Sequence, residues 1–158
     1  MPQDLFFCRS WQRASKSASQ DWPVEMARLA HAARQPYTVL VGSRARPECV
    51  LEIASRFVGI FFLDRLRRER LNYWFQEFAP GELFLSSANY HRFVGDGDAL
   101  ALSLSCSFSR QGEAHARRRQ RLPSPGFDSY RCRFDVSSHY DTFPAFGNYA
   151  SLIRRDRG

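Results

Sequence analysis

Strict alternation of apolar and polar residues is the clearest pattern in this sequence. From Leu100 to Phe108 every second residue is apolar, and serine fills most of the positions between them. A period of two predicts a strand with one packed face and one face in water. Because the turn-forming residues Gly95–Asp98 come shortly before it, we expect this strand to follow a hairpin turn.

Other short apolar runs predict further strands, each bounded by turn-forming residues. They cover Tyr37–Val41, Glu82–Ser87, Ala114–Leu122 and Tyr130–Val136. The third run is rich in arginine, which is typical of an edge strand because the charges discourage pairing with another sheet.

Residues 47–78 fit two interpretations. Alternation in Cys49–Ile53 favours a strand, although a helix would also gather apolar residues of this region on one face. Glycine and β-prone residues in Phe57–Leu63 disfavour a long helix, so we predict successive strands here. The charged stretch Asp64–Arg70 would be a turn or a helix start, and the aromatic stretch Leu71–Phe78 another strand.

The N-terminal part predicts a loop followed by a helix. Residues 1–20 form a poorly ordered lead-in in this interpretation, since residues 11–20 are polar and rich in serine. The sequence Asp21-Trp22-Pro23 is typical of a helix start, with a capping acid and a first-turn proline, and Gln35-Pro36 ends the helix. The apolar residues with helical spacing, which should face the core, are Met26, Leu29, Ala30 and Ala33.

Together these elements predict an α+β fold, mainly an antiparallel β-meander sheet with the N-terminal helix packed on it. A chain of 158 residues is long enough for one such domain, and two domains would each have too small a core. We therefore predict a single domain over residues 1–158.

Charge and cysteine usage narrow the class of protein. The net charge is +7, and all of the 23 basic residues except Lys16 are arginine. This bias reflects either guanidinium chemistry toward phosphates and carboxylates or a GC-rich genome, and the even scatter of arginine favours the second explanation. The chain has four widely spaced cysteines and neither an export signal nor an apolar run of membrane length. We expect a cytoplasmic protein with no membrane partner and with reduced core thiols, Cys106 and Cys132 lying on packed strand faces.

No motif in the chain predicts catalysis or metal binding. The segment Gly95–Asp98 lacks the further ligands of a calcium loop, and the four histidines lack metal-binding spacing. A nucleophile elbow and a phosphate-binding glycine loop are also missing. We therefore predict that the protein is not an enzyme and uses no cofactor or metal.

Arginine clusters are the remaining functional signal. They consist of Arg65, Arg67, Arg68 and Arg70, of Arg117, Arg118, Arg119 and Arg121, and of Arg154, Arg155 and Arg157. With the aromatic residues between them they would dock on an acidic protein surface, bind nucleic acid, or remain a solvated face. The predicted partner-binding residues are Arg65, Arg67, Arg68, Arg117, Arg118, Arg119, Arg121 and Tyr140.

Several motifs in the second part of the chain occur together. Toward the C-terminus, Asp135–Tyr149 combines an aromatic residue, a proline, a Phe-Gly pair and a tyrosine, and a basic tail follows at Arg154-Arg155. Earlier, Phe62-Leu63-Asp64 precedes the aromatic Tyr73–Phe78 and then Pro80–Leu85. Over Phe57–Arg155 the chain thus resembles small bacterial immunity-type proteins, which accompany polymorphic or contact-dependent toxins. Those proteins have a polar, glycine-containing turn after Phe-Leu-Asp, where this chain has Arg65–Arg70.

This resemblance implies a non-enzymatic inhibitor that binds one cognate toxin in the cytoplasm and blocks its active site or its access to substrate. A toxin that acts on nucleic acid usually has a basic active site, so the +7 charge argues against a simple nuclease inhibitor. The alternative is a basic accessory protein that binds nucleic acid through its arginine clusters.

Overall fold

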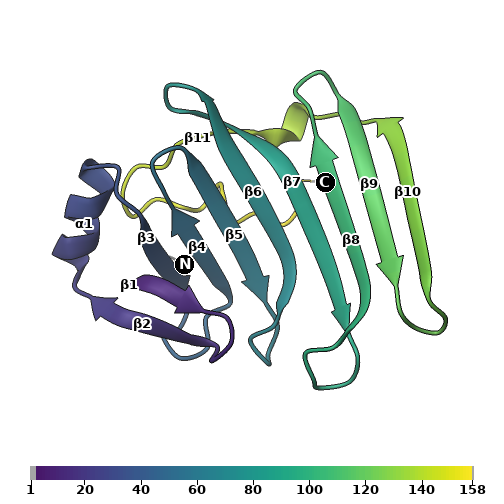
Figure 1. Cartoon of the computed structure of the whole chain (residues 1–158). Coiled ribbons are helices and arrows are strands. Elements are labelled where there is room, and N and C mark those ends of the chain that lie inside the picture. The colour runs from purple at the N-terminus through teal and green to yellow at the C-terminus, as the bar shows by residue number, and fades with distance from the viewer. Residues whose placement is uncertain (1–2, 158) are drawn as a thin grey trace.

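The computed structural model describes residues 3–157, which form one antiparallel sheet of eleven strands with a single α-helix (Figure 1). The elements are β1 (Leu5–Gln12), β2 (Ser17–Trp22), α1 (Val24–Ala32), β3 (Tyr37–Val41), β4 (Cys49–Ile53), β5 (Phe57–Leu63), β6 (Glu69–Ala79), β7 (Glu82–Phe93), β8 (Leu100–Phe108), β9 (Glu113–Gln120), β10 (Gly126–Arg133), a 3₁₀ turn η1 (Ser137–His139) and β11 (Tyr140–Thr142).

The sheet is a meander from β3 to β10, because each of these strands pairs with the next one in the chain. This confirms the predicted mainly antiparallel meander with one helix. At its other end the order changes to β3-β1-β2, so β1 lies between two strands that follow it in sequence. Helix α1 joins β2 to β3 and contacts β1 and β3.

Residues 47–78 form three successive strands, β4 to β6, so the strand interpretation is confirmed and the helical one is wrong. The charged stretch after β5 makes a tight turn. The Asp64 carboxylate accepts hydrogen bonds from the backbone N–H groups of Leu66 and Arg68. Arg67 has φ +61°, so it occupies the left-handed conformation that usually favours glycine.

The predicted N-terminal loop is wrong for most of its length, since β1 and β2 form a hairpin. Phe7 packs into one core cluster and the neighbouring Cys8 into the other, and Trp11 is also buried. Because both faces of β1 are covered, its side chains show no alternation of apolar and polar residues. Burial raises the pKa of the Cys8 thiol to about 11.

The helix is correct in type, but its start differs from the prediction. It begins at Val24 with Pro23 at the N-cap, and no side chain caps it. Asp21 instead belongs to β2, where its carboxylate forms an ion pair with Arg44 at 2.6 Å.

The predicted buried face of the helix is wrong for Met26 and Leu29, although Ala30 does pack against the core as predicted. Leu29 is 70% exposed and Met26 47% exposed, whereas Ala27 is fully buried. Small side chains at Ala27 and Ala30 face the core because they allow the helix axis to lie close to the neighbouring strands.

The far end of the sheet differs from the prediction in two ways. The arginine-rich strand β9 is not an edge, because β10 pairs along its length. The last long strand covers Gly126–Arg133 instead of Tyr130–Val136, and all of its residues are exposed. Cys132 is therefore an exposed thiol, contrary to the expected core position. Strand β8 is half-buried on its leucine side, which residues 3–157 cover only in part.

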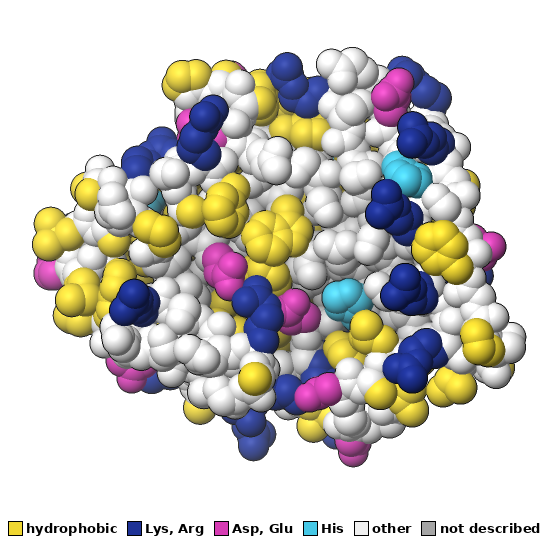
Figure 2. Space-filling view, viewed as in Figure 1, with side chains coloured by type: hydrophobic (Ala, Val, Ile, Leu, Met, Phe, Trp, Pro, Cys, Tyr) yellow, Lys and Arg dark blue, Asp and Glu magenta, His cyan; other side chains and the backbone are white. Residues whose placement is uncertain are grey.

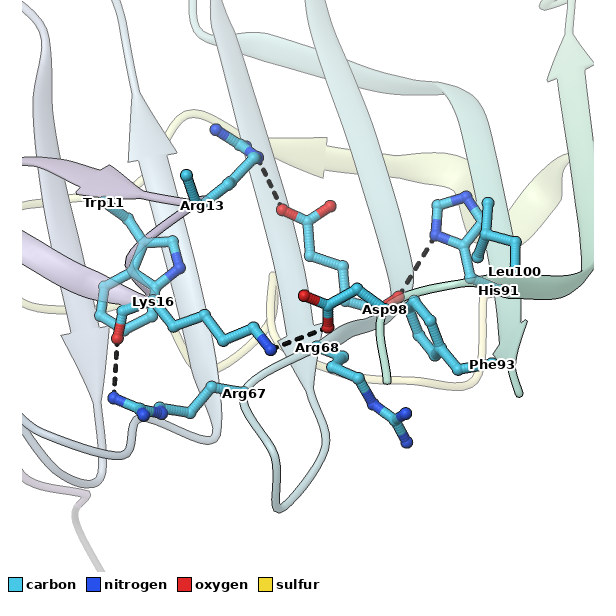
Figure 3. A pocket seen from close by; sticks show the side chains of 11 residues that line it. Trp11, Arg13, Lys16, Arg67, Arg68, His91, Phe93, Asp98 and Leu100 are labelled. Atoms are coloured by element: carbon cyan, nitrogen blue, oxygen red, sulfur yellow. Dashed lines mark hydrogen bonds and ion pairs between the residues drawn. The ribbon is translucent and has the colours of Figure 1, made fainter. Parts of the chain in front are cut away.

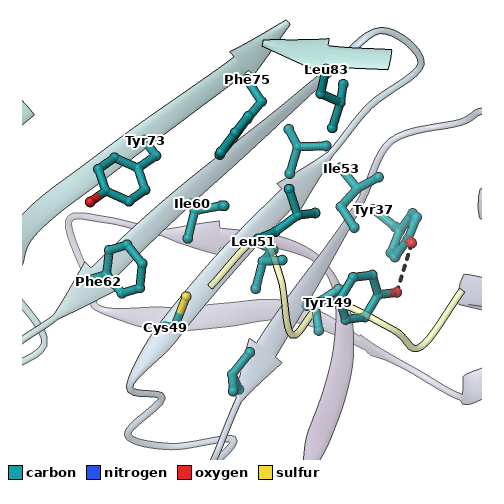
Figure 4. Close-up of a cluster of buried hydrophobic side chains, with 14 of the residues drawn as sticks. Tyr37, Cys49, Leu51, Ile53, Ile60, Phe62, Tyr73, Phe75, Leu83 and Tyr149 are labelled. Carbon is teal, nitrogen blue, oxygen red and sulfur yellow. Dashed lines mark hydrogen bonds between the residues drawn. The ribbon is translucent and has the colours of Figure 1, made fainter. Parts of the chain in front are cut away.

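The core lies against one face of the sheet, here called the back face, which carries Leu51, Ile60 and Phe75 (Figure 4). The C-terminal segment, residues 135–157, crosses this face and contributes Tyr149 and Leu152. The Tyr149 hydroxyl lies 3.0 Å from the Tyr37 hydroxyl within the core. The C-terminal segment and α1 together supply the second layer that this half of the sheet requires.

His139 should make the stability of the fold depend on pH. Its ring is fully buried among Phe84, Phe108 and Phe134, and neither ring nitrogen has a hydrogen-bond partner within residues 3–157. Burial lowers the pKa of His139 below its ordinary value of 6.5. Below about pH 6.5 the unfolded chain therefore takes up a proton more readily than the folded one, and stability should fall as the pH decreases through the folded pKa.

Urea denaturation of the wild type and of His139→Leu, each at neutral and at mildly acidic pH, tests this expectation. We expect the wild type to lose more stability on acidification than the variant. His31, whose pKa is also lowered by burial and by Arg34, is retained in both proteins and serves as the internal reference. An equal loss in the two proteins would contradict the role of His139.

Candidate binding surface

The opposite face of the sheet is open over β6–β10 and is here called the front face (Figure 2). Lys and Arg side chains gather there over β9 and β10, while uncharged polar side chains lie over β7 and β8. The β1–β2 hairpin covers only the part of the front face over β3 to β5, where Leu40, Val50 and Phe61 are buried. A broad polar surface therefore remains free beside it.

Strand register builds this surface from residues far apart in the sequence. Three rows of paired residues cross it, namely Trp74–Ser87–Ser107–His115–Arg131, Asn72–Asn89–Ser105–Arg117–Ser129 and His91–Ser103–Arg119–Phe127. Directly paired residues on one face lie about 5 Å apart, so each row is a continuous strip of side chains. The serines of β8 form the floor of this surface, and the cations of β9 and β10 form one side.

An aromatic side chain borders the other side of the surface. Trp74 pairs with Gly59, and its ring meets that of Phe61 at 5.2 Å in a T-shaped contact. A Cβ atom at Gly59 would lie 2.9 Å from Cζ3 of Trp74. Glycine at this position therefore allows the indole to lie across the neighbouring strand.

The arginines of the surface carry free positive charge. Within residues 3–157, Arg117, Arg119 and Arg131 form no ion pair. His115 Nε2 lies 2.8 Å from the Ser129 hydroxyl, which orients the imidazole beside them. Guanidinium groups next to hydroxyls suit a ligand with several carboxylates or phosphates.

A pocket of about 360 Å³ lies at one end of the front face, beneath the tip of the β1–β2 hairpin (Figure 3). The Lys16 ammonium pairs with Asp98 at 2.8 Å, and the Arg67 guanidinium donates to the Lys16 carbonyl oxygen at 2.8 Å. Arg13 pairs with Glu69 at 2.6 Å. These contacts join the hairpin to the loops after β5 and β7, so they fix the boundary of the surface.

The first arginine cluster mainly fastens loops. Arg68 pairs with Asp64 at 2.9 Å and donates to the carbonyl oxygens of Gly95 and Gly97. Arg67 holds the hairpin, as described above. Arg65 is highly exposed and lies 3.9 Å from Asp96, away from the three rows.

The second cluster is divided between the two faces of the sheet. Arg117 and Arg119 lie on the front face, whereas Arg118 points to the back face and pairs with Asp128 at 3.6 Å. Arg121 follows β9 and donates its backbone N–H to the Ala101 carbonyl oxygen. Of the second cluster, only Arg117 and Arg119 join the rows.

The remaining predicted residues lie elsewhere. Tyr140 belongs to β11, where its ring packs against Phe78 and Phe84, and it is not beside the arginines of β9. In the third cluster Arg157 is buried and holds the C-terminal segment in place.

Sequence reasoning missed the partners of these arginines. The serine alternation of β8 was visible, but its alignment with Asn89, His91, His115 and Arg131 depends on the register of four strands. A usable signal was the matching period of two in β8 and β9, which places serines and arginines on one face once the two strands pair.

Neither a metal centre nor a membrane-spanning helix is found in the part of the chain that the structure describes. Residues 3–157 contain no group of three or more His, Cys, Asp and Glu side chains that could hold a metal ion. None of their helices is long and apolar enough to cross a membrane. No known protein family, curated protein or solved structure matches the chain.

Proposed function

We propose that this chain is an immunity-type protein, which binds a cognate toxin in the cytoplasm and neutralises it without catalysis. The observation that supports this proposal is the open front face, where unpaired Arg117 and Arg119 stand beside a floor of serine hydroxyls. Such a surface suits an extended, carboxylate-rich region of a partner, and the sheet that carries it is rigid.

The physical requirements of an inhibitor agree with this surface. Inhibition requires fast association, and complementary charge increases the association rate of two proteins. It also requires a surface that changes little on binding, which reduces the entropy lost in the complex. The cross-strand pairing of β7–β10 supplies that rigidity, since every row is held by two or more ladders of backbone hydrogen bonds.

The test is co-expression with a secreted toxin encoded next to the gene for this chain. We expect the wild type to restore growth, and the double substitution Arg117→Glu and Arg119→Glu to weaken toxin binding at least about a hundredfold, because like charges would then face the acidic partner.

A matched control changes the same number of charges at a different place. Arg9 and Arg56 are exposed and lie outside β6–β10, so Arg9→Glu with Arg56→Glu should leave growth rescue intact. Rescue by the Arg117/Arg119 variant at the wild-type level would reject the front face as the toxin-binding surface. A toxin that kills cells equally with and without the wild-type chain would reject the function.

A second candidate function is binding of single-stranded nucleic acid. Phe127 is 60% exposed beside Arg119, and Trp74 borders the other side of the surface, so bases would stack while arginines neutralise phosphates. This function predicts binding of an oligothymidine probe that weakens steeply with salt and disappears in the Arg117/Arg119 variant. Absence of binding at low salt would exclude it.

A further inference from the structure

Strand β10 is an open edge of the sheet. It ends the strand order, and within residues 3–157 no strand pairs with its outer side (Figure 1). All eight of its residues are exposed. Every second residue of an edge strand points its N–H and C=O groups outward, where an extended segment of another chain can pair with them.

The two sides of β10 differ in chemistry. On the front face Arg131 continues the basic surface formed by Arg117 and Arg119. On the back face Tyr130 is 54% exposed, and it lines an apolar pocket of about 320 Å³ together with Cys132. An added strand would therefore have cations beside its front side chains and apolar side chains beside its back ones.

The other edge of the sheet offers no comparable template. Strand β2 has six residues and is mostly polar. Its residue Gln20 has φ +53°, which departs from the extended conformation required for regular pairing. A partner strand is therefore expected at β10 and not at β2.

Charge makes a second copy of this chain a poor occupant. The front face of β10 carries Phe127, Ser129, Arg131 and Arg133 and no carboxylate, so a second β10 strand would bring two more arginines and no counter-charge to that face. Unlike an acidic strand, it would leave Arg131 and Arg133 without an opposite charge across the ladder. The partner must instead supply negative charge.

We propose that the toxin contributes an extended segment that joins the sheet as a strand beside β10, an inference that rests on the proposed function. The segment alternates carboxylate and apolar side chains. Its carboxylates lie on the front face next to Arg131 and Arg133, and its apolar side chains lie on the back face next to Tyr130. Backbone pairing supplies affinity, and the alternation supplies specificity.

The probe is a synthetic peptide of alternating glutamate and valine, acetylated and amidated and as long as β10. Amide hydrogen exchange of the full-length protein is followed by NMR with and without the peptide. Strand addition should slow exchange at every second amide of β10 by at least about tenfold, because those N–H groups gain hydrogen bonds. Amides of β4, in the middle of the sheet, report that the fold is unchanged.

Charge reversal provides the matched control. A peptide of alternating lysine and valine should leave exchange in β10 unchanged, and Arg131→Glu with Arg133→Glu should invert the preference between the two peptides. Absence of protection at saturating peptide, or protection without the alternation of amides, would overturn the proposal.

The same measurement separates this inference from the proposed function. If the wild-type chain rescues cells from the toxin but the glutamate peptide leaves β10 unprotected, strand addition is wrong and the immunity function remains. If the peptide protects β10 but the toxin kills cells equally with and without the chain, β10 accepts strands of this kind and the immunity function is wrong.

Discussion

Replacing Arg157 with alanine should destabilise the protein by about 3–5 kcal/mol, which is the usual cost of removing one member of a buried ion pair. The Arg157 side chain is 1% exposed and pairs with the Asp141 carboxylate, which is 9% exposed. It also donates to three backbone carbonyl oxygens, those of Ser138, Tyr140 and Ser151. The substitution would leave a buried carboxylate and these carbonyls without their donor.

Urea denaturation of Arg157→Ala beside Arg154→Ala measures this effect. Arg154 lies three residues away, is half exposed, and approaches Asp156 at 3.6 Å. Its removal should change stability by less than about 0.5 kcal/mol, because exposed ion pairs contribute little. If both variants unfold at the same urea concentration, Arg157 does not hold the C-terminal segment.

Replacing Leu152 with alanine should cost about 2–5 kcal/mol, the range observed when a large aliphatic side chain is removed from a core. Leu152 is fully buried in the main cluster, although it lies near the C-terminus, outside any helix or long strand. Leu29→Ala is the control, since Leu29 is 70% exposed and alanine favours a helix. That substitution should change stability by less than about 0.5 kcal/mol.

Thermal or urea unfolding of the two variants decides between the sequence pattern and the structure. Helical spacing alone predicts that Leu29 is a core residue, and it makes no statement about Leu152, which the structure places in the core. A larger loss in Leu29→Ala than in Leu152→Ala would therefore contradict the packing described here.

These two predictions concern the layer that covers the back face. The C-terminal segment and α1 cover the back face over β1 and β3–β7, so the apolar side chains of that face are shielded from water. Because both lie on the back of the sheet, the front face stays open for binding. The C-terminal segment reaches β8 through His139, which packs on Phe108, but it does not cover β10, so Tyr130 on the back face of β10 is exposed.

The arginines behind the biased composition have different structural roles. Arg157 is buried and structural, Arg68 fastens two loops, and Arg117 and Arg119 are unpaired on an open face. Genome composition explains the preference for arginine over lysine equally well at all of them. Only the two arginines on the front face of β9 carry the binding hypothesis, and charge reversal there tests it.

Local pattern was sufficient for several strands that carried their own signal. The alternation in Leu100–Phe108, the apolar run Phe57–Leu63 and the break at Pro80-Gly81 each predicted an element or a turn that the structure contains. The meander order follows from the same observations, because short turns between successive strands make them neighbours in an antiparallel sheet. These inferences depend on residues a few positions apart, which are close in space because they are close in sequence.

Long-range contacts decided the rest. The hairpin at 5–22 has no alternation because Phe7 and Cys8 are buried on opposite faces by different parts of the chain. The burial of Arg157 and Leu152 depends on a sheet formed much earlier in the sequence. The candidate surface depends on register, since Ser105, Asn89 and Arg117 become neighbours only when three strands pair. By itself the sequence determined most strands from β3 onward and their meander order. The hairpin of β1 and β2, and the sides that the strands present to each other and to water, were decided by tertiary packing, because burial is a property of the whole fold.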